Sequence, residues 1–231
     1  MKKLLETACQ QADEVIAAAM GRPCPVKSRL SPRGTIANPT PCALRLDGEG
    51  LLTQQNLSHT WLESVTCQGG FFNFTLREAW FHEAAQHPLE WEELPPLPPV
   101  SIDFPAAIHP GDWVFAGKKA SPERCARQDE GNPGWLVRVT EERLRTLENR
   151  AETARTWTPS QKALLLRLAA YDESASTGRL TAYLTDLSRL IWQEKPHRLP
   201  AELNRCCQAV LHNGRAVIYR KFILSEIVGV K

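Results

Sequence analysis

The stretch HPLEWEELPPLPPVSIDFPAAIHPGDW, residues 87–113, divides the chain into two parts. Six of its prolines lie between Pro88 and Pro105. Because proline has no backbone N–H and restricts the residue before it, neither a helix interior nor a central strand is expected here. We therefore predict an extended, polyproline-like spacer with a folded part on each side of it.

The length and composition suit a folded protein outside the membrane. The chain has 231 residues, 42% of them apolar, and no apolar run approaches the roughly 18 residues that a membrane span requires. Acidic and amide side chains interrupt the N-terminal segment MKKLLETACQQADEVIAAAM, which favours an amphipathic helix over a signal peptide. We expect a cytoplasmic protein with no membrane partner.

The cysteines give no sign of a disulfide framework or of a metal site. There are seven of them, an odd number, and no two have the CxxC spacing. Zinc sites and disulfide-rich folds usually show such paired spacing. We expect free thiols in a reducing compartment, no metal ion and no cofactor.

Residues 1–86 have a mixed pattern of helices and strands. Apolar residues recur at helical spacing through residues 2–20, and Gly21 should end that helix. Further along we predict a strand at Cys42–Leu46, a helix at Leu51–Val65, a strand at Phe71–Leu76 and a helix at Arg77–Gln86. This order indicates a small α/β domain.

The second part of the chain, residues 132–231, reads as helical throughout. Thr158 and Pro159 suit the start of one helix, and Gly214 suits the end of another. The expected helices are Trp135–Arg155, Pro159–Tyr171, Thr177–Gln193, Pro200–Gly214 and Ala216–Val228. Short connections predict a bundle of neighbouring helices. The fold class is therefore α+β, with a linker over residues 87–131 between an α/β domain and an all-α bundle.

One short segment resembles a known family. The stretch QGGFFNFTLREAW, residues 68–80, is similar to the strand that closes the additional N-terminal domain of arginyl-tRNA synthetases, which typically reads GPGFINF. Gly70 and the four residues after it, FFNF, stand at the matching positions. Around this segment the resemblance extends over about 80 residues of the first part. It implies that this part is the additional N-terminal domain found in arginyl-tRNA synthetases.

Three further segments resemble the DALR-type anticodon-binding bundle of the same family. They are NPGWLVRVTEERLRTLENRAE (132–152), RLTAYLTDLSRLIWQ (179–193) and LNRCCQAVLHNGRAVI (203–218). Their order along the chain matches the start, middle and end of that bundle. The resemblance therefore implies an N-terminal domain and an anticodon-binding bundle, as in arginyl-tRNA synthetases.

The catalytic domain of that family has no counterpart here. It carries HIGH-like and KMSKS-like signatures that hold ATP, and neither string occurs in this sequence. Residues 87–131 are too short to hold a nucleotide-binding sheet with its crossover helices. His59, His82 and Cys67 also show no spacing of nucleophile, base and orienting group. We expect no enzymatic activity and assign no catalytic residue.

Phe72 and Asn73 are the first candidates for RNA binding. The resemblance implies that Asn73 contacts a base at the tRNA elbow, and Phe72 or Phe74 could stack on a base. Strand alternation, however, places Phe71, Asn73 and Thr75 on one face and Phe72, Phe74 and Leu76 on the other. The alternative is therefore that Phe72 and Phe74 are core residues and that Asn73 is an ordinary surface amide.

The basic candidates lie in the second part of the chain. Residues 113–231 carry a net charge of +7, residues 87–112 carry −5 and residues 1–86 carry 0. The candidates for phosphate contacts are Arg138, Arg143, Arg145, Arg215, Arg220 and Lys221. For Arg138, Arg143 and Arg145 the alternative is ordinary surface arginines paired with Glu141, Glu142 and Glu148 at helical spacing.

Two functions follow from these features. The first is binding of tRNA, or a tRNA-like RNA, by shape and phosphate contacts. The second is a protein-interaction subunit on the same scaffold, with a protein partner or a second copy of the chain as its ligand. Exposure of Asn73 together with clustered basic side chains favours RNA, whereas a dominant open apolar patch favours a protein partner.

Overall fold

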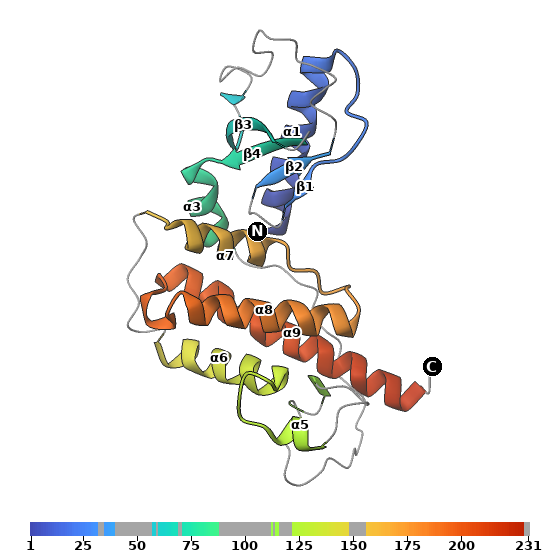
Figure 1. The fold of residues 1–231 in the computed structure, drawn as a ribbon, viewed down its shortest axis with the longest axis vertical. Helices are drawn as coiled ribbons and strands as arrows, with labels where there is room; N and C mark the ends of the chain where they lie inside the picture. The colour runs from blue at the N-terminus through green and yellow to red at the C-terminus, as the bar shows by residue number, and fades with distance from the viewer. Residues whose placement is uncertain are drawn as a thin grey trace. The chain divides into compact units, whose positions relative to one another are not determined.

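The computed structural model describes residues 1–31, 35–39, 57–58, 60–68, 71–87, 112, 114–115, 122–147 and 156–228. These residues form an α+β structure that is mostly helical (Figure 1). The chain divides into two compact units. The first contains Met1–Pro88 and Arg155–Ala170, and the second contains Leu89–Ala154 and Tyr171–Lys231.

The first unit contains a four-stranded antiparallel sheet. Its strands are β1 (Arg29–Leu30), β2 (Ile36–Asn38), β3 (Leu62–Gln68) and β4 (Phe71–Leu76), in the order β1-β2-β4-β3. In the central strand β4 the side chains of Phe72, Phe74 and Leu76 are buried on one face. The predicted strand at Cys42–Leu46 lies outside the described residues.

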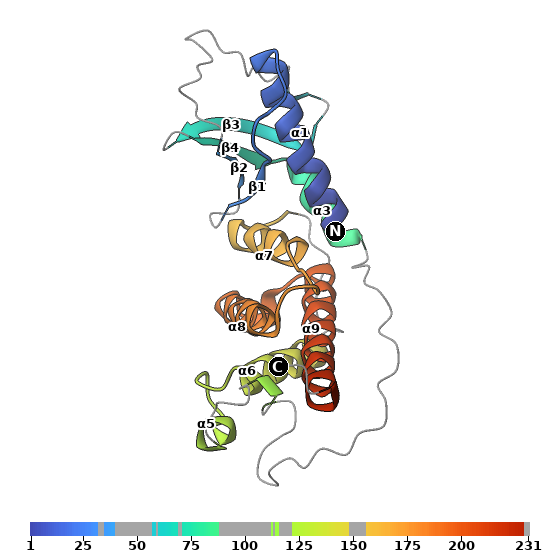
Figure 2. The same ribbon diagram turned by 90° about the vertical axis from the view of Figure 1, so that its right-hand side faces the viewer.

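Helix α1 (Lys2–Met20) contacts β2 and β3, and Figure 2 shows it beside the sheet. Its buried face consists of Leu5, Ala8, Ala12, Val15 and Ile16. The helix ends as predicted at Gly21, which adopts a left-handed conformation with φ of 62°. Glycine tolerates this conformation because it has no Cβ.

One prediction for this unit was wrong. The expected helix at Leu51–Val65 cannot extend to Val65, because β3 begins at Leu62. Val65 pairs with Phe74, and Thr66 pairs with Asn73, in an antiparallel ladder with β4. β-branched side chains suit a strand, and this cross-strand pairing outweighs the helical spacing of the apolar residues.

Helices α3 (Glu78–Gln86) and α7 (Pro159–Ala169) complete the first unit. The predicted capping of α7 is confirmed, since Thr158 and Gln161 form a reciprocal capping box with Pro159 in the first turn. We expected α7 within the C-terminal bundle, but it contacts α1 and α3 and belongs to the first unit. The Lys162 ammonium pairs with the carboxylate of Glu78 on α3.

The second unit is helical in its described residues. It comprises α5 (Pro122–Ala126), α6 (Pro133–Leu147), α8 (Thr177–Gln193), the 3-10 helix η3 (Pro196–Arg198) and α9 (Ala201–Val228). Helices α6, α8 and α9 contact one another, and η3 contacts α6. Helix α5 lies within residues 87–131, where we had predicted only a linker. The Pro-rich stretch Pro88–Pro105 is outside the described residues.

The predicted break at Gly214 was wrong, because α9 continues through it. A Cβ at this position would lie 2.7 Å from both terminal methyl carbons of Leu184 on α8. Leu184 is completely buried. Gly214 therefore serves close packing of α9 against α8, and a glycine in a helix interior does not by itself indicate a helix end.

Candidate nucleic-acid interface

Two surfaces carry the predicted RNA-binding residues, one in each unit. The first is the open face of the sheet. Phe71, at 47% exposure, and the half-buried Asn73 lie on this face of β4. Phe72, in contrast, is only 5% exposed and belongs to the core. Its assignment as a stacking residue was therefore wrong, because a buried ring cannot offer a face to a base.

The neighbours of Asn73 form a row across the open face. In the ladder Asn73 is paired with Ala37 on β2 and Thr66 on β3, and Ala37 is paired with Arg29 on β1. The Asn73 amide nitrogen donates a hydrogen bond to the backbone carbonyl of Phe71 at 3.2 Å. This bond directs the amide toward the Phe71 side of the strand and leaves its carbonyl oxygen as an acceptor.

Sequence reasoning missed Phe71 as the exposed ring. From the sequence we considered Phe72 or Phe74 as the stacking ring, with burial of both in the core as the alternative. The alternation of the strand already placed Phe71 on the same face as Asn73. The burial pattern of β4 confirms this alternation. The two-residue period of the strand was therefore a better guide to the exposed ring than the family motif.

The second surface is formed by α6 and α9 around Glu141, whose side chain is only 3% exposed. One carboxylate oxygen, Oε1, accepts a hydrogen bond from Arg145 at 2.7 Å and lies 3.1 Å from Nδ1 of His212. The other, Oε2, lies 2.5 Å from Nη1 of Arg215. Because an ionised carboxylate has no proton to donate, Nδ1 of His212 is the donor in this pair.

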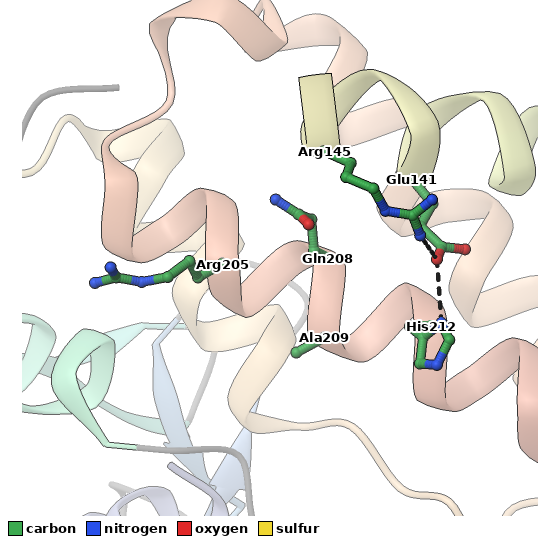
Figure 3. A pocket seen from close by; sticks show the side chains of 6 residues that line it. All are labelled: Glu141, Arg145, Arg205, Gln208, Ala209 and His212. Carbon is green, nitrogen blue, oxygen red and sulfur yellow. Dashed lines mark hydrogen bonds and ion pairs between the residues drawn. The ribbon is translucent and has the colours of Figure 1, made fainter. Parts of the chain in front are cut away.

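A pocket of about 270 Å³ opens beside this carboxylate (Figure 3). It is lined by Glu141, Arg145, Arg205, Gln208, Ala209 and His212. Arg145 and His212 point toward Glu141, and Gln208 projects between the two helices (Figure 3). Of the predicted residues, the structure thus brings Arg145 and Arg215 together on one carboxylate.

Arg138 is occupied elsewhere. Its guanidinium pairs with the buried carboxylate of Asp112 at 3.2 Å and with Glu142 at 3.5 Å. The hydrogen bond to Asp112 raises the pKa of Arg138 above its ordinary value. This arginine therefore holds Asp112 against α6. Arg138 and Arg145 lie on the same helix, but they contact different partners.

The remaining basic candidates differ in their surroundings. Arg143 is exposed, and its side chain has no ion-pair partner among the described residues. Arg220 is half-buried. Lys221 donates hydrogen bonds to the backbone carbonyls of Glu173 and Ala175, at 2.9 and 2.6 Å, in the turn before α8. Lys221 thus holds a turn in place, and this structural role requires no ligand.

The thiols do not form a reactive site. Burial raises the pKa of Cys206 to about 11 and that of the fully buried Cys207 well above its ordinary value, so neither is a thiolate near neutral pH. The expectation of reduced thiols holds for residues 9, 24, 125, 206 and 207. It was wrong for Cys67, which takes part in a disulfide.

The described part of the chain has no group of three or more His, Cys, Asp or Glu side chains placed to hold a metal ion. Within the same residues, none of the helices has an apolar stretch that would cross a bilayer. Comparison of the chain with protein-family models, with curated proteins and with solved structures finds no match.

Proposed function

We propose that this protein is a non-catalytic relative of arginyl-tRNA synthetases that binds tRNA, or a tRNA-like RNA, through shape and phosphate contacts. Residues 1–86 would correspond to the additional N-terminal domain of that family, and residues 132–231, apart from α7, which packs in the first unit, to its DALR-type anticodon-binding bundle. Residues 87–131 would stand where the catalytic domain is inserted in the family. The proposal rests on the sequence motifs and on the two surfaces described above.

The observation that carries this proposal is that Phe71 and Asn73 lie on the same open face of β4. An exposed ring offers a surface on which a base can stack, and the amide offers hydrogen bonds to the edge of an unpaired base. Arg29, exposed on the edge strand β1 two strands away, adds a cation for a backbone phosphate. A sheet face of this composition suits single-stranded or looped RNA.

The second unit supports the same proposal by its charge. Glu141 carries one negative charge, whereas Arg145 and Arg215 carry two positive charges beside it. Arg143 and Arg205 add two exposed guanidiniums on α6 and α9. Such an excess of arginine suits phosphate contacts, which position a nucleic acid without reading its sequence.

The proposal includes no chemistry on the RNA. The HIGH-like and KMSKS-like strings that hold ATP in the family do not occur in this sequence. We therefore expect no aminoacylation and no ATP–pyrophosphate exchange, and we place the activity in the cytoplasm, where tRNA is found. Exchange that depends on arginine and tRNA, from a preparation free of host synthetase, would contradict this part of the proposal.

The proposal is tested with a fluorescently labelled tRNA and the 231-residue chain. We expect salt-dependent binding at micromolar concentration, and a lower affinity for Phe71→Ala and Asn73→Ala. Thr75→Val is the matched control, because Thr75 lies on the same face of β4 and bonds to Ser64 on β3. Stacking on an aromatic ring contributes about 1–3 kcal/mol per base, so Phe71→Ala should weaken binding roughly fivefold or more.

The second candidate function is a protein-interaction subunit. Two large apolar side chains of the second unit favour it, since Trp192 is 42% exposed and Leu224 is 36% exposed. If wild-type protein shows no salt-dependent binding of tRNA, the RNA proposal fails and this alternative becomes the better one. Trp192→Ala and Leu224→Ala should then weaken a protein complex or a dimer of the chain.

A further inference from the structure

The pocket between α6 and α9 is built around a carboxylate whose charge is already neutralised. Glu141 accepts hydrogen bonds from Arg145, His212 and Arg215, so three of its roughly four lone-pair positions are occupied. With a neutral histidine, the carboxylate and its two arginines sum to a positive charge. An anion that enters the pocket therefore meets hydrogen-bond donors, and the carboxylate beside it is already paired with cations.

The donors on the pocket wall are only partly used. Arg145 is 60% exposed and directs one nitrogen, Nη2, to Glu141, which leaves further N–H groups for a ligand. His212 is 75% exposed and uses its Nδ1–H toward Glu141, so in the neutral ring Nε2 is an acceptor and offers no hydrogen bond to an anion. The buried carboxylate therefore orients both side chains, and Arg145 keeps free N–H groups that can bind an anion.

Arg205 and Gln208 provide the other wall. Arg205 is exposed, and its side chain has no hydrogen bond or ion pair among the described residues. In Figure 3 it extends away from Arg145, and its flexible stem lets the guanidinium turn into the pocket. The Gln208 amide nitrogen donates a hydrogen bond to the Asn204 side-chain oxygen at 2.7 Å, which fixes the Gln208 side chain.

These features define the kind of ligand. Planar guanidiniums with several donors match the oxygens of a phosphate group, whereas chloride is a single atom and cannot accept such paired hydrogen bonds. The pocket volume of about 270 Å³ holds a phosphate together with part of an attached sugar.

We infer that the pocket between α6 and α9 binds a phosphate group of RNA, with Arg145 and Arg205 as ligand-binding residues, Glu141 as a positioning residue and His212 at the edge of the site. The inference rests on the proposed function, because it names the place where the second unit takes a backbone phosphate. The same chemistry fits inorganic phosphate, so that anion serves as the probe which does not depend on RNA binding.

The experiment uses the 231-residue chain and two ligands. Inorganic phosphate is titrated at constant ionic strength, with chloride as the reference anion, and binding is followed by the NMR signals of the arginine side chains and of His212. Labelled tRNA is titrated separately. The pocket variant is Arg145→Gln with Arg205→Gln. The control is Arg179→Gln with Arg189→Gln on α8, which removes the same charge from two exposed arginines.

We expect phosphate to bind the wild-type chain in preference to chloride. The pocket variant should weaken both phosphate and tRNA binding by about tenfold, the effect of losing one or two charge-assisted hydrogen bonds. The control should change either affinity by less than about twofold, since it alters charge without altering the pocket.

Three other results separate the two proposals. Phosphate binding that the pocket variant weakens, without tRNA binding by wild-type protein, supports the pocket and contradicts the proposed function. Binding of tRNA that the pocket variant and the control reduce equally overturns the pocket and leaves the proposed function standing. If about 20 mM phosphate shifts no NMR signal of Arg145 or His212, the pocket proposal is also overturned. A site that does not respond at this concentration has a Kd above it and is too weak to be a specific phosphate site.

Discussion

The Oε2 atom of Glu141 lies 2.5 Å from Nη1 of Arg215, although the two residues are 74 positions apart in the chain. Glu141 is on α6 and Arg215 is in the middle of α9, so the pair joins two helices of the bundle. The carboxylate is almost completely buried, and the guanidinium is 27% exposed. A buried charge of this kind is tolerated because several donors surround it.

Glu141→Ala should therefore be strongly destabilising. It leaves the Arg215 guanidinium without its partner in a partly desolvated position, and loss of one partner of a buried pair costs roughly 3 kcal/mol or more. Chemical denaturation should show this loss in the free energy of unfolding. The neighbouring Glu142 is 55% exposed, so Glu142→Ala should cost less than about 1 kcal/mol. Equal effects of the two variants would contradict a structural role for Glu141.

Gly214→Ala should destabilise the protein, although alanine is the better helix former. The new Cβ would lie 2.7 Å from the terminal carbons of the buried Leu184, so that side chain must move within a packed core. Overpacking costs about 1–3 kcal/mol, whereas the gain in helix propensity is about 1 kcal/mol. We expect a net loss of about 1 kcal/mol in the free energy of unfolding.

Gly178→Ala is the matched control for this prediction. Gly178 lies in α8, and a Cβ there would meet no atom within 4 Å. Only the difference in helix propensity remains, so this variant should be neutral or stabilising by up to about 1 kcal/mol. Adding Leu184→Val to Gly214→Ala should restore part of the lost stability by making room. A stabilising effect of Gly214→Ala alone would show that the two helices are not tightly packed.

Most helices could be predicted from the sequence, because their signals are local. The periodic apolar residues, the glycine at position 21 and the cap at Thr158 gave α1, α3, α8 and the start of α7 within a residue or two. The short strands β1 and β2 could not be predicted in this way. They have two and three residues, and they depend on pairing with β4, which lies far along the chain.

The candidate site was only partly predictable for the same reason. Arg145 and Arg215 were selected from charge and helix position, and the spacing of Arg145 from Glu141 was visible. The convergence of Arg215 and His212 on Glu141 requires α6 and α9 to lie side by side, which no local pattern encodes. The burial of Phe72 and the exposure of Phe71 followed from strand alternation alone.

The interaction of Glu78 with Lys162 should make stability depend on pH. Partial burial opposes ionisation of Glu78, but hydrogen bonds from Lys162 and from the Trp157 backbone outweigh it and lower its pKa. A carboxyl whose pKa is lower in the folded state stabilises the fold above the pKa of the unfolded chain. This contribution is lost as the pH falls through the folded-state pKa.

Glu78→Gln should therefore lower Tm at pH 7, and the difference from wild type should shrink as the pH is taken down to about 3. The effect should be small, because the Glu78 side chain is 41% exposed. Glu83→Gln on the same helix, whose carboxylate contacts the exposed His87, provides the comparison. A Tm difference for Glu78→Gln that does not change with pH would argue against an ionic contribution.

The salt dependence of RNA binding distinguishes arginines that contact phosphate from arginines that hold the fold. Arg138 is 21% exposed and pairs with the buried carboxylate of Asp112, whereas Arg143 is exposed and Arg145, although it also pairs with the buried Glu141, is 60% exposed. We expect Arg138→Gln to lower the free energy of unfolding, because it leaves Asp112 buried without a cation. It should leave the salt slope unchanged under conditions where the variant is folded.

Arg143→Gln and Arg145→Gln should instead change the salt slope. Each removes one cation from the RNA-facing surface, so fewer counterions are released on binding. The plot of log affinity against log salt should become shallower by about 0.7–0.9 for each phosphate that the variant no longer neutralises. Tm should stay within about 2 °C of wild type for Arg143→Gln and fall further for Arg145→Gln, which removes one of the three donors to the buried Glu141. Asn73→Ala tests a third kind of contact, a hydrogen bond from an uncharged side chain. It removes a neutral hydrogen-bonding group, so it should weaken binding at every salt concentration and keep the slope of the wild-type protein. A single shared slope for all four variants would mean that neither exposed arginine binds a phosphate.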